Sequence, residues 1–307
     1  MRLKKLYTMK PIITATELSE IFNQENLVIL DARTGKDARE NYLQNHIKGA
    51  RFIDLDKDLA EIGEDAAFGG RHPLPKISKF AETLQNLGIS EDSHIVVYDT
   101  SNGANAAARC WWMLKSFGVE KVQVLSGGFQ TAEKAGIPLK SGEEIFEKTS
   151  FILKENWSWP ISTLEEVEKE ISENSATVID VRDSYRYKGE SEPIDLVAGH
   201  IPDAINIPFS ENLDENGAFL SPETLKEKYH NLLSDASTPL SMTKKLIIHC
   251  GSGVTACHTI LALDYAGFVT LSTDRKSADE VLEVPNLYVG SWSEWSRREG
   301  KEIAREV

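Results

Sequence analysis

Cys250 occupies a position in the sequence where a cysteine can act as a nucleophile. The apolar run Leu246–Ile248 is typical of a short buried strand, and it leads directly into the stretch HCGSGVT at residues 249–255. An apolar segment of helical character follows. In parallel sheets, ligands bind where the carboxyl ends of strands lead into helices. Cys250 is therefore expected at the edge of a ligand site.

The residues that follow this cysteine predict a loop that binds an anion. Gly251 and Gly253 allow tight and left-handed turns, so the peptide N–H groups of residues 251–255, including Val254, can point inward. Thr255 is predicted to cap the next helix, whose positive end faces the same point. In such a setting the pKa of a thiol falls from about 8.5 toward neutrality. The alternative is a small buried side chain that ends a core strand, but the combined pattern favours a reactive thiol.

The bulk composition limits the partners and the compartment. The 307 residues carry a formal net charge of −14, which argues against nucleic acid or an anionic membrane as a partner. No window is long and apolar enough to span a membrane, and the basic start lacks the apolar segment of a signal peptide. Cys110, Cys250 and Cys257 cannot form a disulfide framework, and no Cys/His spacing indicates a metal site. We expect a cytoplasmic protein with free thiols and no cofactor.

Three segments of the amino-terminal half recur in the same order in the carboxyl-terminal half, which indicates duplication of one unit. Residues 27–55 match 176–208, residues 94–114 match 246–263, and residues 122–132 match 287–295. In the second match, Asp99 stands where the other copy has Cys250. His46 and His200 also occupy matching places, so we expect them to have a structural role. A carboxylate cannot perform thiol chemistry, so one catalytic and one supporting domain are expected.

The hydrophobic pattern predicts an α/β fold in which strands and helices alternate. Short buried strands and amphipathic or apolar helices follow one another in both halves, which is typical of a mostly parallel sheet flanked by helices. We expect a non-catalytic domain at residues 1–140, a linker at 141–160 and a catalytic domain at 161–307. The expected strands are Leu27–Leu30, Ile95–Val97, Val122–Leu125, Val178–Val181, Leu246–Ile248 and Leu287–Val289, and the expected helices are Ser78–Leu87, Ala104–Phe117, Leu164–Ile171 and Thr255–Tyr265.

One enzyme class that uses a similar loop is excluded by a single position. Cysteine phosphatases carry the pattern H-C-x5-R, in which the arginine binds the phosphate. Ala256 stands at the arginine position of this chain. Without that bidentate donor, a phosphate dianion loses its strongest contact.

The chain resembles the rhodanese superfamily in its two-domain sulfurtransferase form, from about Thr16 to Arg297. The loop CGSGVTA at residues 250–256 is similar to that of 3-mercaptopyruvate sulfurtransferases. Supporting motifs are GHIPDAINIP at 199–208, WWMLKSFGVEKVQVLSGGF at 111–129 and GSWSEW at 290–295. The resemblance implies two tandem rhodanese-like domains and the transfer of sulfur through a persulfide on the cysteine.

The resemblance also implies roles for individual residues. Cys250 would attack the sulfur of the donor, and Ser252, His72 and Asp56 would assist proton movement. Arg186 would bind the carboxylate of the donor. The family usually has a second arginine where this chain has Ile194, so we expect that Lys188 or Arg71 supplies the missing charge. Gly251, Gly253, Val254 and Thr255 would hold the transferred sulfur.

The sequence leaves three functions open. The first is transfer of sulfur from 3-mercaptopyruvate to cyanide or a thiol, such as a small thiol or a thioredoxin-like protein, with release of pyruvate. The second is a thiosulfate:cyanide sulfurtransferase, which a loop without basic residues makes less favourable because thiosulfate carries two charges. The third is a non-catalytic persulfide carrier or interaction module.

Overall fold

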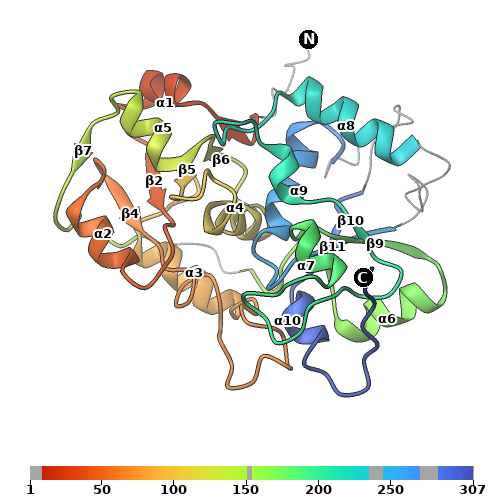
Figure 1. Ribbon diagram of the computed structural model, residues 1–307. Coiled ribbons are helices and arrows are strands. Elements are labelled where there is room, and N and C mark those ends of the chain that lie inside the picture. Colours follow the sequence, from red (N-terminus) through yellow and green to blue (C-terminus); the bar gives the residue numbers. More distant parts are fainter. Residues whose placement is uncertain (1–8, 151–153, 235–244, 270–282, 307) are drawn as a thin grey trace, which may run out of the picture.

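The structure is a computed structural model that describes residues 9–150, 154–234, 245–269 and 283–306. Figure 1 shows two α/β units side by side, the amino-terminal unit in red to yellow and the carboxyl-terminal unit in green to blue. Each unit contains one five-stranded sheet, and all strand pairs in both sheets are parallel. The α/β class and the two sheets flanked by helices agree with the expectation from the sequence.

The amino-terminal sheet has the strand order β1-β6-β5-β2-β4. Its strands are β1 (Ile12–Ile13), β2 (Leu27–Asp31), β4 (Ala50–Phe52), β5 (His94–Tyr98) and β6 (Val122–Leu125). Its helices are α1 (Ala15–Ile21), α2 (Ala38–Gln44), α3 (Ile77–Asn86), α4 (Ala106–Phe117) and α5 (Gly128–Lys134). Two further strands, β3 (His46–Ile47) and β7 (Leu139–Lys140), form a small antiparallel pair.

The carboxyl-terminal sheet repeats this order as β8-β12-β11-β9-β10. Its strands are β8 (Ile161–Ser162), β9 (Ala176–Asp180), β10 (Ile205–Asn206), β11 (Lys245–His249) and β12 (Asn286–Tyr288). Its helices are α6 (Leu164–Ser172), α7 (Ser184–Lys188), the 3-10 helix η1 (Phe209–Asn212), α8 (Pro222–Ser234), α9 (Ala256–Tyr265) and α10 (Ser291–Trp295). The equal strand order in both sheets supports duplication of one unit.

The first helix of each unit begins with a capping box. Thr14 and Thr163 each accept a hydrogen bond from the backbone three residues later, and Glu17 and Glu166 bond back to the threonine N–H. These capping boxes satisfy N–H groups that a helix start otherwise leaves unpaired. They place α1 and α6 directly after the edge strands β1 and β8.

The two units share a core at their boundary. Helices α4 and α9 pack against each other between the sheets, as both views show. The connecting segment adds aromatic rings, since Trp159 packs edge-on against Trp111 and Trp112, and Trp157 lies against Phe80. No helix in the described part of the chain is long and apolar enough to cross a membrane.

Both units contain a buried aspartate–arginine pair directly after the second strand of the unit. Arg33 donates through Nε and Nη2 to Asp31, and Arg182 does the same to Asp180. Both aspartate side chains are fully buried. The pairs fix the carboxyl ends of β2 and β9, where the functional loops begin.

The two matching histidines also make equivalent contacts. The Nδ1 atom of His46 lies 2.8 Å from the carbonyl oxygen of Tyr42, and that of His200 lies 2.8 Å from the carbonyl oxygen of Tyr187. Each imidazole stacks on the ring of the same tyrosine. The structural role expected for these histidines is therefore supported.

Replacing Arg33 by methionine is expected to lower the free energy of unfolding by about 3–5 kcal/mol, because Asp31 would remain buried without its cation. Arg39→Met is the control, since Arg39 and its partner Glu143 are both about half exposed and such pairs contribute less than about 1 kcal/mol. Urea unfolding of the two variants measures the difference. Equal losses would contradict the structural role assigned to the buried pair.

Candidate active site

Cys250 lies at the carboxyl end of β11, in the loop that leads to α9. Its side chain is almost completely buried, with 2% exposure. The backbone N–H of Cys250 donates to Ser291 Oγ at 3.2 Å, and its carbonyl accepts from the N–H of Trp292 at 3.0 Å. The cysteine is thus fixed between the central strand and the start of α10.

The two glycines of the loop are needed for different reasons. Gly253 has φ +74°, and a methyl group there would lie 2.6 Å from the carbonyl oxygen of Val289. The left-handed turn expected at Gly253 is therefore present. Gly251 is not in the left-handed region; instead, a methyl group there would lie 3.0 Å from Arg71 Nη2 and 3.3 Å from Arg186 Nη2. Gly251 leaves room for two guanidinium groups to approach the loop.

Thr255 is the N-cap residue of α9, but its side chain makes no capping hydrogen bond. The expected side-chain cap is wrong, because Thr255 already has helical dihedral angles (φ −72°, ψ −15°), whereas a capping side chain requires an extended residue. Within the described chain, the N–H groups of residues 251–255 have no hydrogen-bond acceptor. Buried N–H groups are normally paired, so this loop is suited to an anion.

The matching loop of the amino-terminal unit contains such an anion. The Asp99 carboxylate accepts hydrogen bonds from four backbone N–H groups, those of Ser101, Gly103, Asn105 and Ala107, at 2.8–3.1 Å. Asp99 is 1% exposed. Burial raises the pKa of Asp99, and these four bonds act in the opposite direction. The strand-to-helix loop of this fold can therefore hold a negative charge through its peptide groups.

Ser252, His72 and Asp56 form a chain of polar contacts next to Cys250. Ser252 Oγ lies 2.8 Å from His72 Nδ1, and His72 Nε2 lies 3.2 Å from Asp56 Oδ1. Ser252 is buried, whereas 63% of the Asp56 side chain is exposed. Asp56 and His72 line a pocket of about 450 Å³ on the amino-terminal unit. The chain of contacts thus leads from the buried loop toward solvent, as a proton path requires.

The protonation of His72 suits the role of a proton acceptor. Burial, together with the positive charge of Arg71, lowers the pKa of His72 from 6.5 to about 4, although Asp56 acts in the opposite direction. His72 is therefore neutral near pH 7. With its Nε2–H directed at the Asp56 carboxylate, Nδ1 is free to accept the hydroxyl proton of Ser252.

A short loop of the amino-terminal unit, residues 69–72, packs against the other unit and places His72 there. The N–H of Gly69 donates to Glu294 Oε1 at 2.8 Å, and the N–H of Arg71 donates to Ser293 Oγ at 3.0 Å. Gly70 has φ +78°, and a methyl group there would lie 2.3 Å from the carbonyl oxygen of Gly290. The motif GSWSEW, at residues 290–295, is therefore the surface on which this loop docks.

Arg71 and Lys188, the two candidates for a second positively charged residue at the substrate site, lie in different surroundings. Arg71 reaches the loop beside Gly251, next to Arg186. Lys188 is exposed at the end of α7, and no contact connects its side chain to this cluster among the described residues. The structure thus favours Arg71 over Lys188. Sequence reasoning missed Asp195 and Arg297, which join the cluster through an ion pair of 2.9 Å.

Arg109 is a third site residue that sequence reasoning missed. It is fully buried in α4, and its guanidinium donates to the carbonyl oxygens of Gly253, His72 and Leu59 at 3.1–3.4 Å. It therefore joins the cysteine loop to the segment that carries the histidine. The only signal in the sequence was an arginine within the apolar stretch AAARCWWML.

The other two thiols lie in less reactive surroundings. Cys257 is fully buried in α9, and burial raises its pKa to about 12. Cys110 is fully buried in α4, and burial raises its pKa further still. The described residues contain no group of three or more potential metal ligands.

Comparisons with known proteins show the family of this chain. A family model described as a rhodanese-like domain matches residues 14–135 and again residues 163–298. A probable 3-mercaptopyruvate sulfurtransferase from Pseudomonas aeruginosa is 37% identical over 289 residues, which cover 92% of this chain and 94% of that protein. A thiosulfate sulfurtransferase from Rattus norvegicus is 35% identical over 267 residues, which cover 86% of this chain and 81% of that protein.

A similar solved structure is also that of a sulfurtransferase. The 3-mercaptopyruvate sulfurtransferase from Leishmania major matches with a TM-score of 0.75 at 28% identity, over 94% of this chain and 74% of that chain. The chain therefore belongs to the rhodanese family, contains two copies of its domain and is a sulfurtransferase. The family resemblance seen in the sequence is confirmed.

Gly70→Ala is expected to reduce turnover at least roughly tenfold, because the added methyl group moves the 69–72 loop off Gly290 and separates His72 from Ser252. Gly49→Ala is a matched control: Gly49 is also left-handed, at φ +81°, but nothing lies within 4 Å of an added methyl group. The control should lose about 1 kcal/mol of stability and keep its activity. Steady-state kinetics and urea unfolding measure both effects, and equal activity losses would contradict the docking role of Gly70.

The low pKa of His72 predicts a pH-dependent contribution to stability. Between pH 6.5 and 4 the unfolded chain protonates this histidine whereas the folded chain does not, so stability should fall as the pH is lowered through this window. The free energy of unfolding of the wild type minus that of His72→Gln should decrease by at most about 1.4 kcal/mol per pH unit. Urea titrations at pH 7, 6, 5 and 4 measure it. A difference independent of pH would show that His72 titrates normally.

Proposed function

We propose that this sulfurtransferase takes its sulfur from 3-mercaptopyruvate, carries it as a persulfide on Cys250 and releases pyruvate. The observation that carries the proposal is the contact of 2.8 Å between His72 Nδ1 and Ser252 Oγ, two residues from Cys250. This contact joins a proton acceptor of one unit to the cysteine loop of the other. The names of the relatives from Pseudomonas aeruginosa and Leishmania major support the choice of donor.

In the proposed first half-reaction, the Cys250 thiolate attacks the sulfur atom of the donor. The new S–S bond forms while the C–S bond of the donor breaks, and the electron pair stays on carbon as the enolate of pyruvate. The thiol proton of the donor passes through Ser252 to Nδ1 of His72, whose Nε2–H faces Asp56, and returns by the same way to the enolate carbon, which gives pyruvate. The unpaired N–H groups of residues 251–255 hold the negative sulfur.

The carboxylate of the donor binds beside Gly251 in this proposal. Arg186 and Arg71 approach the loop there, and a guanidinium matches the two oxygens of a carboxylate. The arginines Arg71, Arg186 and Arg297 face the carboxylates Glu192 and Asp195, which leaves a single net positive charge. One net charge suits a monoanionic donor better than the thiosulfate dianion.

In the second half-reaction, an acceptor attacks the outer sulfur of the persulfide and restores the Cys250 thiolate. Cyanide, a small thiol or a thioredoxin-like protein has the required nucleophile. The mechanism needs a free thiol, and all three cysteines are free, so we propose that the protein works in a reducing compartment, the cytoplasm.

A second candidate donor is thiosulfate, which is favoured by the similarity to the Rattus norvegicus enzyme. The ratio of the kcat/KM values for the two donors, with cyanide as acceptor, distinguishes these functions. A passive persulfide carrier is the third possibility. It is disfavoured by the polar contacts that join Ser252 beside Cys250 to His72 and Asp56, which a passive carrier does not need.

Incubation with 3-mercaptopyruvate is expected to add one sulfur atom to the wild type and to release an equivalent amount of pyruvate. Cys250→Ser should do neither, whereas Cys110→Ala should behave as the wild type, because Cys110 lies in the core of α4. Intact-mass spectrometry and a pyruvate assay provide the measurements. Persulfide formation in Cys250→Ser would overturn the assignment, and its absence in the wild type would overturn the proposed donor.

A further inference from the structure

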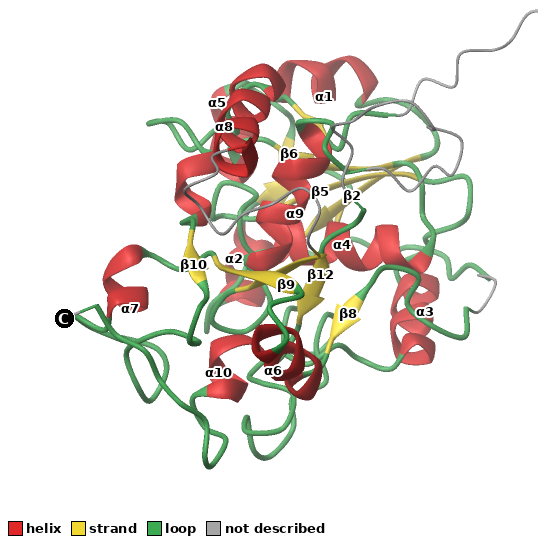
Figure 2. Cartoon of the chain, turned by 90° about the vertical axis from the view of Figure 1, so that its right-hand side faces the viewer, coloured by secondary structure: helices red, strands yellow, loops and turns green. Residues whose placement is uncertain are grey.

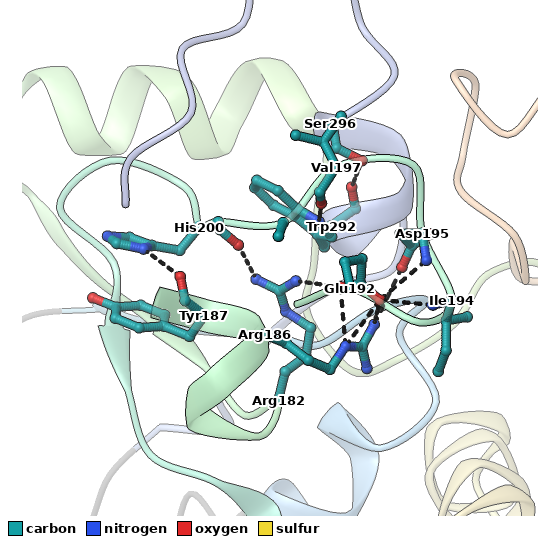
Figure 3. A network of polar contacts seen from close by, with 12 residues as sticks. Arg182, Arg186, Tyr187, Glu192, Ile194, Asp195, Val197, His200, Trp292 and Ser296 are labelled. Carbon is teal, nitrogen blue, oxygen red and sulfur yellow. Dashed lines mark hydrogen bonds and ion pairs between the residues drawn. The ribbon is translucent and has the colours of Figure 1, made fainter. Parts of the chain in front are cut away.

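A fully buried carboxylate lies among three arginines beside the cysteine loop. Asp195 Oδ1 accepts from Arg71 Nε at 3.0 Å and from Arg297 Nη1 at 2.9 Å. Asp195 Oδ2 lies 3.3 Å from Arg71 Nη2 and 3.4 Å from Arg186 Nη2. Figure 3 shows Asp195 on one side of Arg186 and Glu192 between Arg186 and Arg182. The cluster therefore already contains an anion of its own.

The two oxygens of Asp195 are held unequally. The bonds to Oδ1 have the length of good charge-assisted hydrogen bonds, whereas those to Oδ2 are long. Oδ2 is also the oxygen nearest the cysteine loop, since a methyl group on Gly251 would lie 3.4 Å from it. Oδ2, the weakly held oxygen, thus contacts the Nη2 groups of Arg71 and Arg186. These are the groups that the carboxylate of the donor would bind.

The segment around Asp195 is held by polar contacts and not by apolar packing. The neighbouring side chains of Ile194 and Leu196 are 56% and 73% exposed, so they add little apolar packing. The N–H groups of Ile194 and Asp195 both donate to Glu192 Oε1, which is a local contact. Two carboxylates therefore link this segment to the arginines: Glu192 pairs with Arg186 Nη2 at 2.8 Å, and Asp195 pairs with Arg71 and Arg297.

We infer that Asp195 lowers the affinity of the site for the donor's carboxylate, as an internal anion that competes with it for the Nη2 groups of Arg71 and Arg186, while Glu192 stays paired with Arg186. The inference rests on the proposed function, because it takes the donor to be a carboxylate. A bound donor displaces Oδ2 from the two Nη2 groups, while Oδ1 stays on Arg71 Nε and Arg297. Each carboxylate ligand therefore binds at the cost of an internal ion pair, and its affinity is lower than two free arginines would give.

Replacement of Asp195 by asparagine tests this competition. Pyruvate is the probe, and isothermal titration calorimetry measures its dissociation constant for the wild type, Asp195→Asn and Arg186→Ala. Loss of the competing charge should lower the constant roughly tenfold in Asp195→Asn, the size expected for one charge-assisted contact, and Arg186→Ala should raise it. Equal or weaker binding by Asp195→Asn would overturn the inference, because Asp195 would then only orient the arginines.

A second measurement uses the wild type alone, in case Asp195→Asn does not fold. Pyruvate and its neutral methyl ester are compared as ligands. If Asp195 competes for the two Nη2 groups, the carboxylate should bind less than roughly tenfold more tightly than the ester. A preference of roughly a hundredfold or more would mean that the arginines are free and that Asp195 does not compete. Absence of the persulfide in the wild type tests the proposed function separately, because both binding experiments proceed without turnover.

Discussion

The peptide N–H groups of the strand-to-helix loop need an anion, and the rest of the site depends on this need. In the amino-terminal unit the Asp99 carboxylate pairs with four of them. In the carboxyl-terminal unit the N–H groups of residues 251–255 have no acceptor among the described residues, and Cys250 stands where Asp99 does. The second loop therefore offers its peptide groups to an anion beside Cys250.

The site is completed only by cooperation of the two units. The amino-terminal unit contributes His72, Arg71 and the fully buried Arg109, while the other unit contributes the loop and Arg186. Backbone contacts of the 69–72 loop with Gly290 and its neighbours fix the distance between them. The amino-terminal unit, which has Asp99 in place of a cysteine, therefore contributes polar and charged side chains to the surroundings of Cys250.

The sequence predicted those features that depend on local pattern. The central strands, the strand-end position of Cys250 and the left-handed turn at Gly253 follow from neighbouring residues, although strand and helix limits shift by one or two positions. The two-residue edge strands β1, β8 and β10 were missed because such short segments have no periodicity. Arg109, Asp195 and Arg297 were missed because their roles arise from contacts with residues far away in the chain, and a charge in a sequence does not reveal its partner. The contact of His72 with Ser252 was expected only through the family resemblance.

The carboxylate in the amino-terminal loop has a consequence for how such a molecule arises by duplication. A unit whose buried loop always requires a negative group cannot simply lose its reactive sulfur, because several peptide groups would be left without an acceptor. An aspartate at this position keeps those groups satisfied with a single change of side chain. The loop of the amino-terminal copy is thus filled by its own side chain and has no room or need for an external anion.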